Sequence, residues 1–180
     1  LLVGGLAWAE TSAVQVGKTG LMHSTDPATQ GEIREIAAAS SARHALLVWQ
    51  TSGHYFLGPS SRLNAALLAE DGSPGKRPLE ACQDTEVREK PAIAYNDGRF
   101  LLVWQQFSRS RDWDIYGTLI EENGNVAHAC GYPIANGAPN QALPAVAAAA
   151  GGFIVLWQEA SAGEHNQLRT AKVDAKGMPG

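Results

Sequence analysis

Three short apolar segments, each ending in Trp-Gln, divide the chain into similar units. They span Ala45 to Gln50, Phe100 to Gln105 and Phe153 to Gln158, and their tryptophans lie 55 and 53 residues apart. A short, continuous apolar run between turn residues is typical of a strand that is buried on both faces. The pattern therefore predicts one central, buried strand in each unit.

Two further markers recur in the same order. A second apolar segment starts thirteen residues before each tryptophan, at Ile36, Pro91 and Pro144. A turn follows each tryptophan strand, and its glycines are Gly72, Gly124 and Gly177. The spacings, 55 and 53 for the first marker and 52 and 53 for the second, nearly equal the tryptophan spacing. Self-similarity at such a period is typical of propellers and other repeat architectures.

The unit that starts at Pro91 divides into four predicted strands. The first is closed by the hairpin signal Asn96-Asp97-Gly98, and the buried strand Arg99 to Gln105 follows. Residues 113–121 alternate imperfectly between apolar and polar, and residues 128–135 form a weaker outer strand. Four antiparallel strands in about 53 residues are typical of a β-propeller blade.

We expect one all-β repeat domain over residues 1–180. Its units are a partial unit at about 1–35, complete units at 36–90 and 91–143, and a partial unit at 144–180. Propellers typically contain about 4–8 blades, so two complete units are too few to close a ring. Either four shortened blades close, or the remaining strands come from a larger propeller or from a second subunit of a homo-oligomer.

The third unit carries the motif that suggests a family. Its Pro91, Gly98 and Trp104, the run from Asp114 to Gly117, and Gly124 resemble the blades of bacterial β-propellers of the exported, TolB-like or WD40-like kind. The other units depart from this motif, with Leu63 to Ala66 and Leu168 to Ala171 in place of Asp-Ile-Tyr-Gly. The resemblance implies an extracellular or periplasmic location, and its motifs specify packing and turns rather than chemistry.

Composition excludes several classes of protein. The 180 residues are 44% hydrophobic, which argues against intrinsic disorder, and the net charge of -4 argues against a nucleic-acid partner. The apolar N-terminal segment is only eight residues long, so no membrane span is expected. Cys82 and Cys130 lie far apart and form either one disulfide or two buried thiols.

No catalytic, metal-binding or cofactor-binding motif is present. The segment Val16 to Thr19 has Ser12 where a phosphate-binding loop needs glycine. The five histidines form no pair at metal-ligand spacing, and Asp112 with Asp114 is a weak calcium signal. We therefore expect no catalytic residue, no metal and no cofactor.

Loops that follow the tryptophan strands converge at one end of a propeller, so they supply the candidate ligand-binding residues. These are His54, Tyr55, Phe107, Arg109, Arg111, Glu164 and His165. Residues expected to hold the repeat together are Trp8, Trp49, Trp104, Trp157, Gly72, Gly124, Gly177, Pro91 and Pro144.

Three functions are compatible with this pattern. The leading hypothesis is a non-enzymatic module that binds a protein or carbohydrate partner through this loop face. The alternative is a fragment of a propeller-type hydrolase or lyase, with paired carboxylates drawn from Asp112, Glu159 or Glu164. The third is a purely structural segment of a larger assembly.

Overall fold

The structure, a computed structural model, describes residues 32–55, 58–73, 75, 79–80, 86–107, 112–161 and 165–180. For residues 53–55, 58–60 and 79–80 it describes the backbone alone. Every regular element in these ranges is a β-strand, as the sequence predicts. They contain no helix long and apolar enough to cross a membrane.

The strands form three antiparallel sheets that follow one another along the chain. The first sheet contains β1 (Glu32–Ser40), β2 (Ala45–Tyr55), β3 (Gly58–Leu68) and β4 (Leu79–Glu80). The second contains β5 (Val87–Asn96), β6 (Arg99–Phe107), β7 (Trp113–Glu121) and β8 (Tyr132–Ala135). The third contains β9 (Gln141–Ala149), β10 (Gly152–Glu159) and β11 (Gln167–Asp174).

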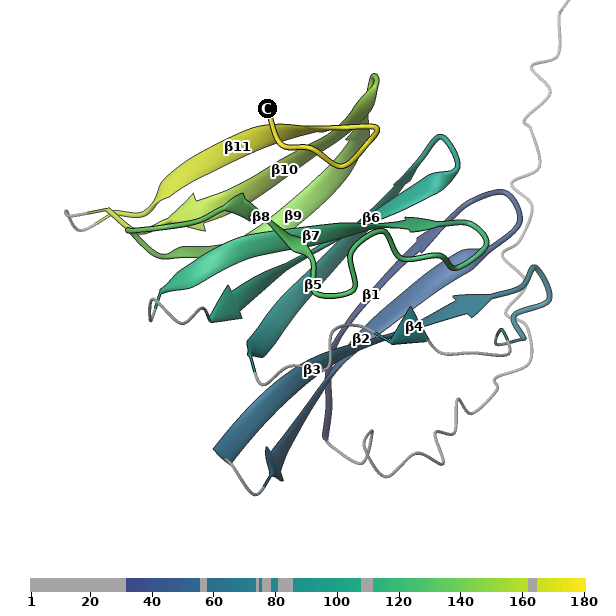
Figure 1. Cartoon of the computed structure of the whole chain (residues 1–180), viewed down its shortest axis with the longest axis horizontal. Coiled ribbons are helices and arrows are strands. Elements are labelled where there is room, and N and C mark those ends of the chain that lie inside the picture. Colours follow the sequence, from purple (N-terminus) through teal and green to yellow (C-terminus); the bar gives the residue numbers. More distant parts are fainter. Residues whose placement is uncertain are drawn as a thin grey trace, which may run out of the picture.

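The three sheets are stacked face against face (Figure 1). Their first strands, β1, β5 and β9, are neighbours, and we call them the inner strands. Trp49, Trp104 and Trp157 lie on the second strands, β2, β6 and β10. Each complete sheet is thus a four-stranded meander of sequential neighbours, the arrangement predicted for a blade.

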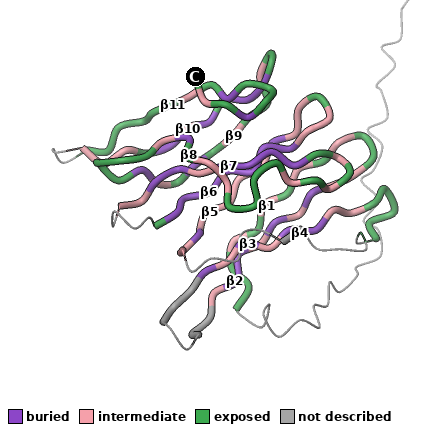
Figure 2. The backbone as a smooth tube through the Cα atoms, in the orientation of Figure 1, coloured by how far each residue is buried: buried purple, intermediate pink, exposed green. Residues whose placement is uncertain are grey.

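Each second strand has two apolar faces, because it lies between two sheets. On β6, Phe100, Leu102 and Trp104 pack against the first sheet, in a cluster with Leu46 and Val48. Leu101 and Val103 of the same strand pack against the third sheet, in a cluster that includes Trp157. This two-sided burial explains why β6 is continuously apolar from Phe100 to Trp104 (Figure 2).

The turn glycines adopt the left-handed conformation that favours glycine. The φ angles of Gly72, Gly124 and Gly177 are 79°, 90° and 90°. In each turn the glycine N–H donates to a backbone carbonyl three residues earlier, for example Gly124 to Glu121 at 2.9 Å. These contacts show why glycine recurs at this position of the repeat.

The outer strand of the second sheet is shorter than predicted. We expected it to span residues 128–135, whereas β8 covers only Tyr132–Ala135. The Thr118 hydroxyl donates to the His128 carbonyl at 2.8 Å and accepts from the His128 N–H at 3.2 Å. The Thr118 side chain therefore makes the hydrogen bonds with His128 that a paired strand would otherwise make. Cys130 in this loop is disulfide-bonded, and Cys82 lies outside the described residues.

Candidate functional site

The turns of all three sheets gather at the two ends of the strands. The β1–β2, β5–β6 and β7–β8 connections lie at one end, which we call the turn end. The β2–β3 and β6–β7 connections and the starts of β5 and β9 lie at the other, which we call the entry end. Each end brings together residues that are far apart in the sequence.

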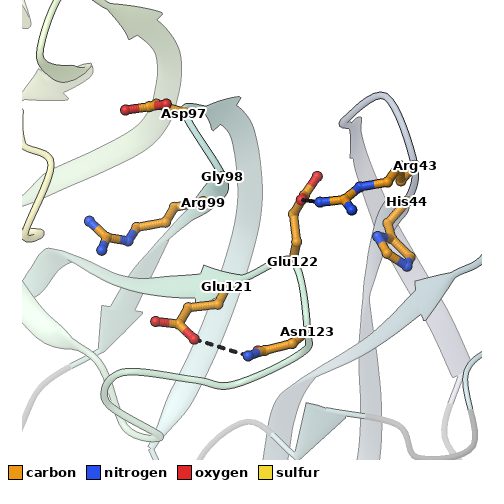
Figure 3. Close-up of a pocket in the computed structure, with 8 residues that line it drawn as sticks. All are labelled: Arg43, His44, Asp97, Gly98, Arg99, Glu121, Glu122 and Asn123. Carbon is orange, nitrogen blue, oxygen red and sulfur yellow. Dashed lines mark hydrogen bonds and ion pairs between the residues drawn. The ribbon is translucent and has the colours of Figure 1, made fainter.

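A pocket of about 510 Å³ opens at the turn end, between the first and second sheets (Figure 3). Its charged and polar lining comes from three separate turns: Arg43, His44, Asp97, Arg99, Glu121, Glu122 and Asn123. The Arg43 guanidinium and the Glu122 carboxylate form an ion pair at 2.9 Å. The Tyr95 hydroxyl donates to the other Glu122 oxygen at 3.1 Å.

Glu122 therefore acts as a bridge between sheets. Hydrogen bonds from Ser41 and Arg43 of the first sheet, with a smaller contribution from Tyr95, hold the pKa of the Glu122 carboxyl below its usual value. Both carboxylate oxygens are occupied by these partners. This arrangement stabilises the contact between two sheets and does not offer a carboxylate to a ligand.

A lowered pKa makes this bridge sensitive to acid. Glu122 contributes stability above the carboxyl pKa of the unfolded chain, about 4.3, and loses it as pH falls through the lower folded value. We expect Glu122→Gln to flatten the fall in unfolding free energy below about pH 4.5. Urea unfolding at a series of pH values measures this slope. Arg43→Gln should flatten it in part, and an unchanged slope in Glu122→Gln would contradict the assignment.

The entry end contains a repeated irregularity of the inner strands. Glu35, Lys90 and Leu143 have positive φ angles of 42°, 55° and 55°, although none is glycine. They recur at the spacing of the repeat. Next to each of them, the pairing of the inner strand with the second strand of its sheet shifts by one residue. Such β-bulges re-aim side chains and are frequent beside active sites.

Each bulge lies opposite the tryptophan of its sheet. In the second sheet Glu89 pairs with Gln105 and Ala92 with Val103, so that Lys90 and Pro91 together face Trp104. Proline lacks a backbone N–H and is tolerated at a bulge, where no ladder bond is lost. This explains why Pro91, and Pro144 in the third sheet, recur in the sequence.

The entry ends of neighbouring sheets are connected through Gln50 and Gln105, the glutamines that follow Trp49 and Trp104. Gln50 donates to the Ser61 hydroxyl at 2.8 Å, which donates to the Arg88 carbonyl of β5 at 2.6 Å. Gln105 accepts from the Leu143 N–H of β9 at 2.9 Å. Both glutamines are buried, so the entry ends of neighbouring sheets are joined by bonds shielded from water.

Charged side chains of the first two inner strands meet at these bulges. The Lys90 ammonium forms an ion pair with the Glu35 carboxylate of the neighbouring sheet. Glu89 accepts a hydrogen bond from the Gln105 amide at 3.4 Å. The pKa of Arg34 is raised mainly by its hydrogen bond to Glu32, and the Glu89 carboxylate adds a smaller contribution. Glu35 and Glu89 therefore belong to one electrostatic cluster at the entry end.

The candidate residues from the sequence lie around this end where the structure describes them. Phe107 at the end of β6 is 37% exposed and packs edge-on against Trp113, with ring centroids 5.4 Å apart. His165 is exposed just before β11. The backbone of His54 and Tyr55 belongs to the end of β2. Arg109, Arg111, Glu164 and the repeat residue Trp8 lie outside the described residues.

Sequence reasoning missed the two inner-strand carboxylates. A usable signal exists in hindsight, because Glu35, Lys90 and Leu143 each directly precede a repeat marker at Ile36, Pro91 or Pro144. Among the described residues, no group of three or more His, Cys, Asp or Glu side chains is arranged to hold a metal ion.

Comparison with known proteins identifies the fold. The α-L-arabinofuranosidase from Lactobacillus brevis is similar over 82% of this chain and 55% of its own, with 14% identity and a TM-score of 0.52. A glycosyl hydrolase from Bacteroides ovatus is similar over 82% of this chain and 48% of its own, with 12% identity and a TM-score of 0.51. A thermostable family-43 glycoside hydrolase is similar over 76% of this chain and 53% of its own, with 10% identity and a TM-score of 0.50. The fold is that of a β-propeller.

The chain spans about half the length of these solved structures, with 55%, 48% and 53% of their chains covered. It therefore forms a segment of a propeller, as its two complete sheets and one three-stranded sheet also indicate. No family model matches the sequence, and no curated protein matches it.

The leading functional hypothesis from the sequence is wrong. We expected a non-enzymatic module that binds a partner through its loops, whereas the similar structures are glycoside hydrolases. This finding favours the alternative, a fragment of a propeller-type hydrolase. The repeat motifs of the sequence specify the packing of a propeller and not its function, so they could not decide between these hypotheses.

Proposed function

We propose that the chain is part of a propeller-type glycoside hydrolase whose sugar substrate binds at the entry end. The observation that carries the proposal is the placement of Glu35 and Glu89 on two neighbouring inner strands, each at or beside a left-handed bulge at the entry end. Similarity to an arabinofuranosidase supports arabinose-containing glycans as the substrate class. The exposed aromatic ring of Phe107 adds a surface on which a sugar ring can stack.

Glycoside hydrolysis requires two carboxyl groups with different tasks. One protonates the oxygen of the leaving group, and the other activates water or attacks the anomeric carbon itself. The Glu35 ion pair with Lys90 uses an ionised carboxylate, so we assign Glu35 the second task. Glu89, the carboxyl group of the second inner strand, is assigned the proton transfer to the leaving oxygen.

The carboxylates suggested by the sequence alone are less suitable for this role. Glu159 is the last residue of β10, the second strand of its sheet, and is not on an inner strand. Asp112 directly precedes β7, the third strand of its sheet, and is not on an inner strand. Glu164 lies outside the described residues. The inner-strand pair therefore replaces them in the proposal.

The activity test measures sugar release from arabinan, arabinoxylan and aryl arabinofuranosides. We expect the 180-residue chain to hydrolyse at least one of them. Glu35→Gln and Glu89→Gln should each lower kcat/KM by about 10²–10⁴-fold, the usual contribution of a positioned acid or base. Glu121→Gln, at the turn end, is the matched control and should retain the wild-type rate.

Two results would overturn the proposal. One is that the folded wild-type chain releases no sugar from any of these substrates. The other is that hydrolysis occurs but survives both inner-strand substitutions. Circular dichroism spectra of the variants establish that a loss of rate reflects chemistry rather than unfolding.

A further inference from the structure

Leu143 combines two unusual features at the entry end of β9. Its φ angle is 55°, in the left-handed region that a leucine rarely adopts. Its side chain is also 47% exposed. A single exposed leucine is ordinary on a protein surface, but a strained backbone is found most often at functional sites. The combination makes Leu143 a candidate for a role in the site.

Leu143 has the same place in the third sheet as Glu35 and Lys90 have in the first two. Each has a left-handed backbone beside the point where the pairing of its inner strand shifts. The side chains of Glu35 and Lys90 form an ion pair between their sheets. The inner strands β1, β5 and β9 are neighbours in this order. The three bulges therefore form one row across the entry end, in which two charged residues are followed by an apolar one.

Hydrogen bonds connect Leu143 to the second candidate carboxylate. The Leu143 N–H donates to the Gln105 Oε1 at 2.9 Å, and the Nε2 of the same amide donates to Glu89 at 3.4 Å. Gln105 is 6% exposed, so its amide is largely shielded from water. One side chain thus spans the distance from the Leu143 backbone to the Glu89 carboxylate. Leu143 therefore lies in the same site as the carboxyl groups of the proposed function.

We propose that Leu143 determines which kind of sugar the site accepts. Its exposed side chain packs against the apolar C–H face of a neutral sugar unit and disfavours a sugar acid. The contact removes apolar surface of both partners from water, which favours binding. The inference rests on the proposed function and specifies the substrate class of the same site.

Two cations of the first two inner strands are already engaged by carboxylates. The Lys90 ammonium, the cation of the row, is paired with Glu35. The Arg34 guanidinium is bonded to the Glu32 carboxylate at 2.7 Å. Placing the carboxylate of a sugar acid against an apolar side chain removes its hydration, a cost that only a paired opposite charge offsets. A neutral sugar meets no such penalty beside Leu143.

The strained backbone of Leu143 separates this role from a structural one. Asparagine adopts the left-handed conformation more readily than leucine and has nearly the same size, but its side chain is polar. Leu143→Asn should therefore leave the melting temperature unchanged or raise it, while the apolar contact with the sugar is lost. A leucine needed for packing alone would instead lower the melting temperature when it is replaced.

Isothermal titration calorimetry with arabinotriose and with trigalacturonate compares a neutral and an anionic ligand. The titrations use the Glu89→Gln variant, which should hydrolyse arabinotriose too slowly to disturb them. Leu143→Asn on this background should weaken arabinotriose binding about 3–10-fold, the equivalent of burying half a leucine side chain, and leave trigalacturonate binding unchanged. Steady-state kinetics on the otherwise unmodified chain should show the same factor in KM, with kcat nearly unchanged.

Asp97→Asn is the matched control. Asp97 is also a left-handed residue other than glycine, with a φ of 43°, and it lines the pocket at the turn end. Its substitution should change neither the affinity for arabinotriose nor KM. The inference is overturned if trigalacturonate binds more tightly than arabinotriose, or if Leu143→Asn leaves arabinotriose binding unchanged.

The outcomes also separate this inference from the proposed function. Hydrolysis with a KM that Leu143→Asn does not change overturns the inference alone. Arabinotriose binding that Leu143→Asn weakens, in a chain that hydrolyses no substrate, overturns the proposed function alone. Absence of binding to both ligands overturns both. Weaker binding together with a lowered melting temperature assigns Leu143 a structural role and also overturns the inference.

Discussion

Gly152→Ala is expected to destabilise the protein by about 2–6 kcal/mol, combining backbone strain with forced overpacking. Gly152 begins β10 with a φ of 152°, and an added Cβ would lie 2.1 Å from the Val173 carbonyl oxygen of β11. Neither atom can move aside alone, because the backbone of β10 fixes the Cβ position and the oxygen belongs to the backbone of the paired strand β11. The Gly152 carbonyl also accepts a hydrogen bond from Asn96 at 2.7 Å, so the second sheet is affected too.

The neighbouring glycine supplies the control. Gly151 has a φ of 73° and open space around the position of an added Cβ. Gly151→Ala should therefore lower the unfolding free energy by only about 1–2 kcal/mol, the penalty for a non-glycine residue in the left-handed conformation. Urea unfolding monitored by tryptophan fluorescence measures both variants. Equal losses would show that the contact with Val173 is relieved by adjustment of the strands.

Phe100→Ala is expected to lower the unfolding free energy by about 3–5 kcal/mol, the usual cost of emptying a buried aromatic site. Phe100 is 0% exposed and packs in the cluster between the first and second sheets. Its ring lies 4.9 Å from that of Tyr95, whose hydroxyl bonds Glu122 at the turn end. The cavity should therefore loosen the contact between these two sheets as well as the core itself.

Phe107→Ala on the same strand is the matched control. Phe107 is 37% exposed, and its main described contact is the edge-on pair with Trp113. Its loss should cost about 0.5–1.5 kcal/mol, the value of one aromatic pair. A loss in Phe107→Ala as large as in Phe100→Ala would contradict the assignment of the core.

The sequence predicted the strands best where burial is two-sided. The strand β7 spans residues 113–121 as expected, and β6 extends the predicted strand only by Gln106 and Phe107. Both strands lie between two sheets, so nearly every side chain must be apolar or hydrogen-bonded. The apolar pattern in the sequence is therefore strong. The outer strand β8 has one buried residue, Ile134, and its pattern was too weak to set its start.

The start of each inner strand could not be predicted for a different reason. β5 begins at Val87 and β9 at Gln141, several residues before the prolines that we took as the first strand residues. The bulge interrupts the alternation of apolar and polar side chains there. The residue with the left-handed conformation can be Glu, Lys or Leu, because the hydrogen bonds of the surrounding strands hold it in place. No residue type is typical of such a bulge position, although the positions recur with the spacing of the repeat.

The candidate residues from the sequence and the carboxylates that carry the proposal come from different parts of the fold. The loops after the tryptophan strands lie at the entry end, near Phe107 and His165, as the blade topology requires. The carboxylates that carry the proposal, Glu35 and Glu89, come from strands rather than loops. These strands lie side by side because the two sheets stack, and the sequence of a single repeat does not specify this stacking.

The bulges of the inner strands have a consequence for how this protein can diversify. An extra residue reverses the phase of side-chain alternation, so the residues before a bulge follow a different in-and-out pattern from those after it. Substitutions at Glu32 to Arg34 or Val87 to Glu89 therefore change the entry end without moving Ala37 or Ala94 from their faces. The bulge thus separates the side-chain pattern of the entry end from the strand register that holds the core.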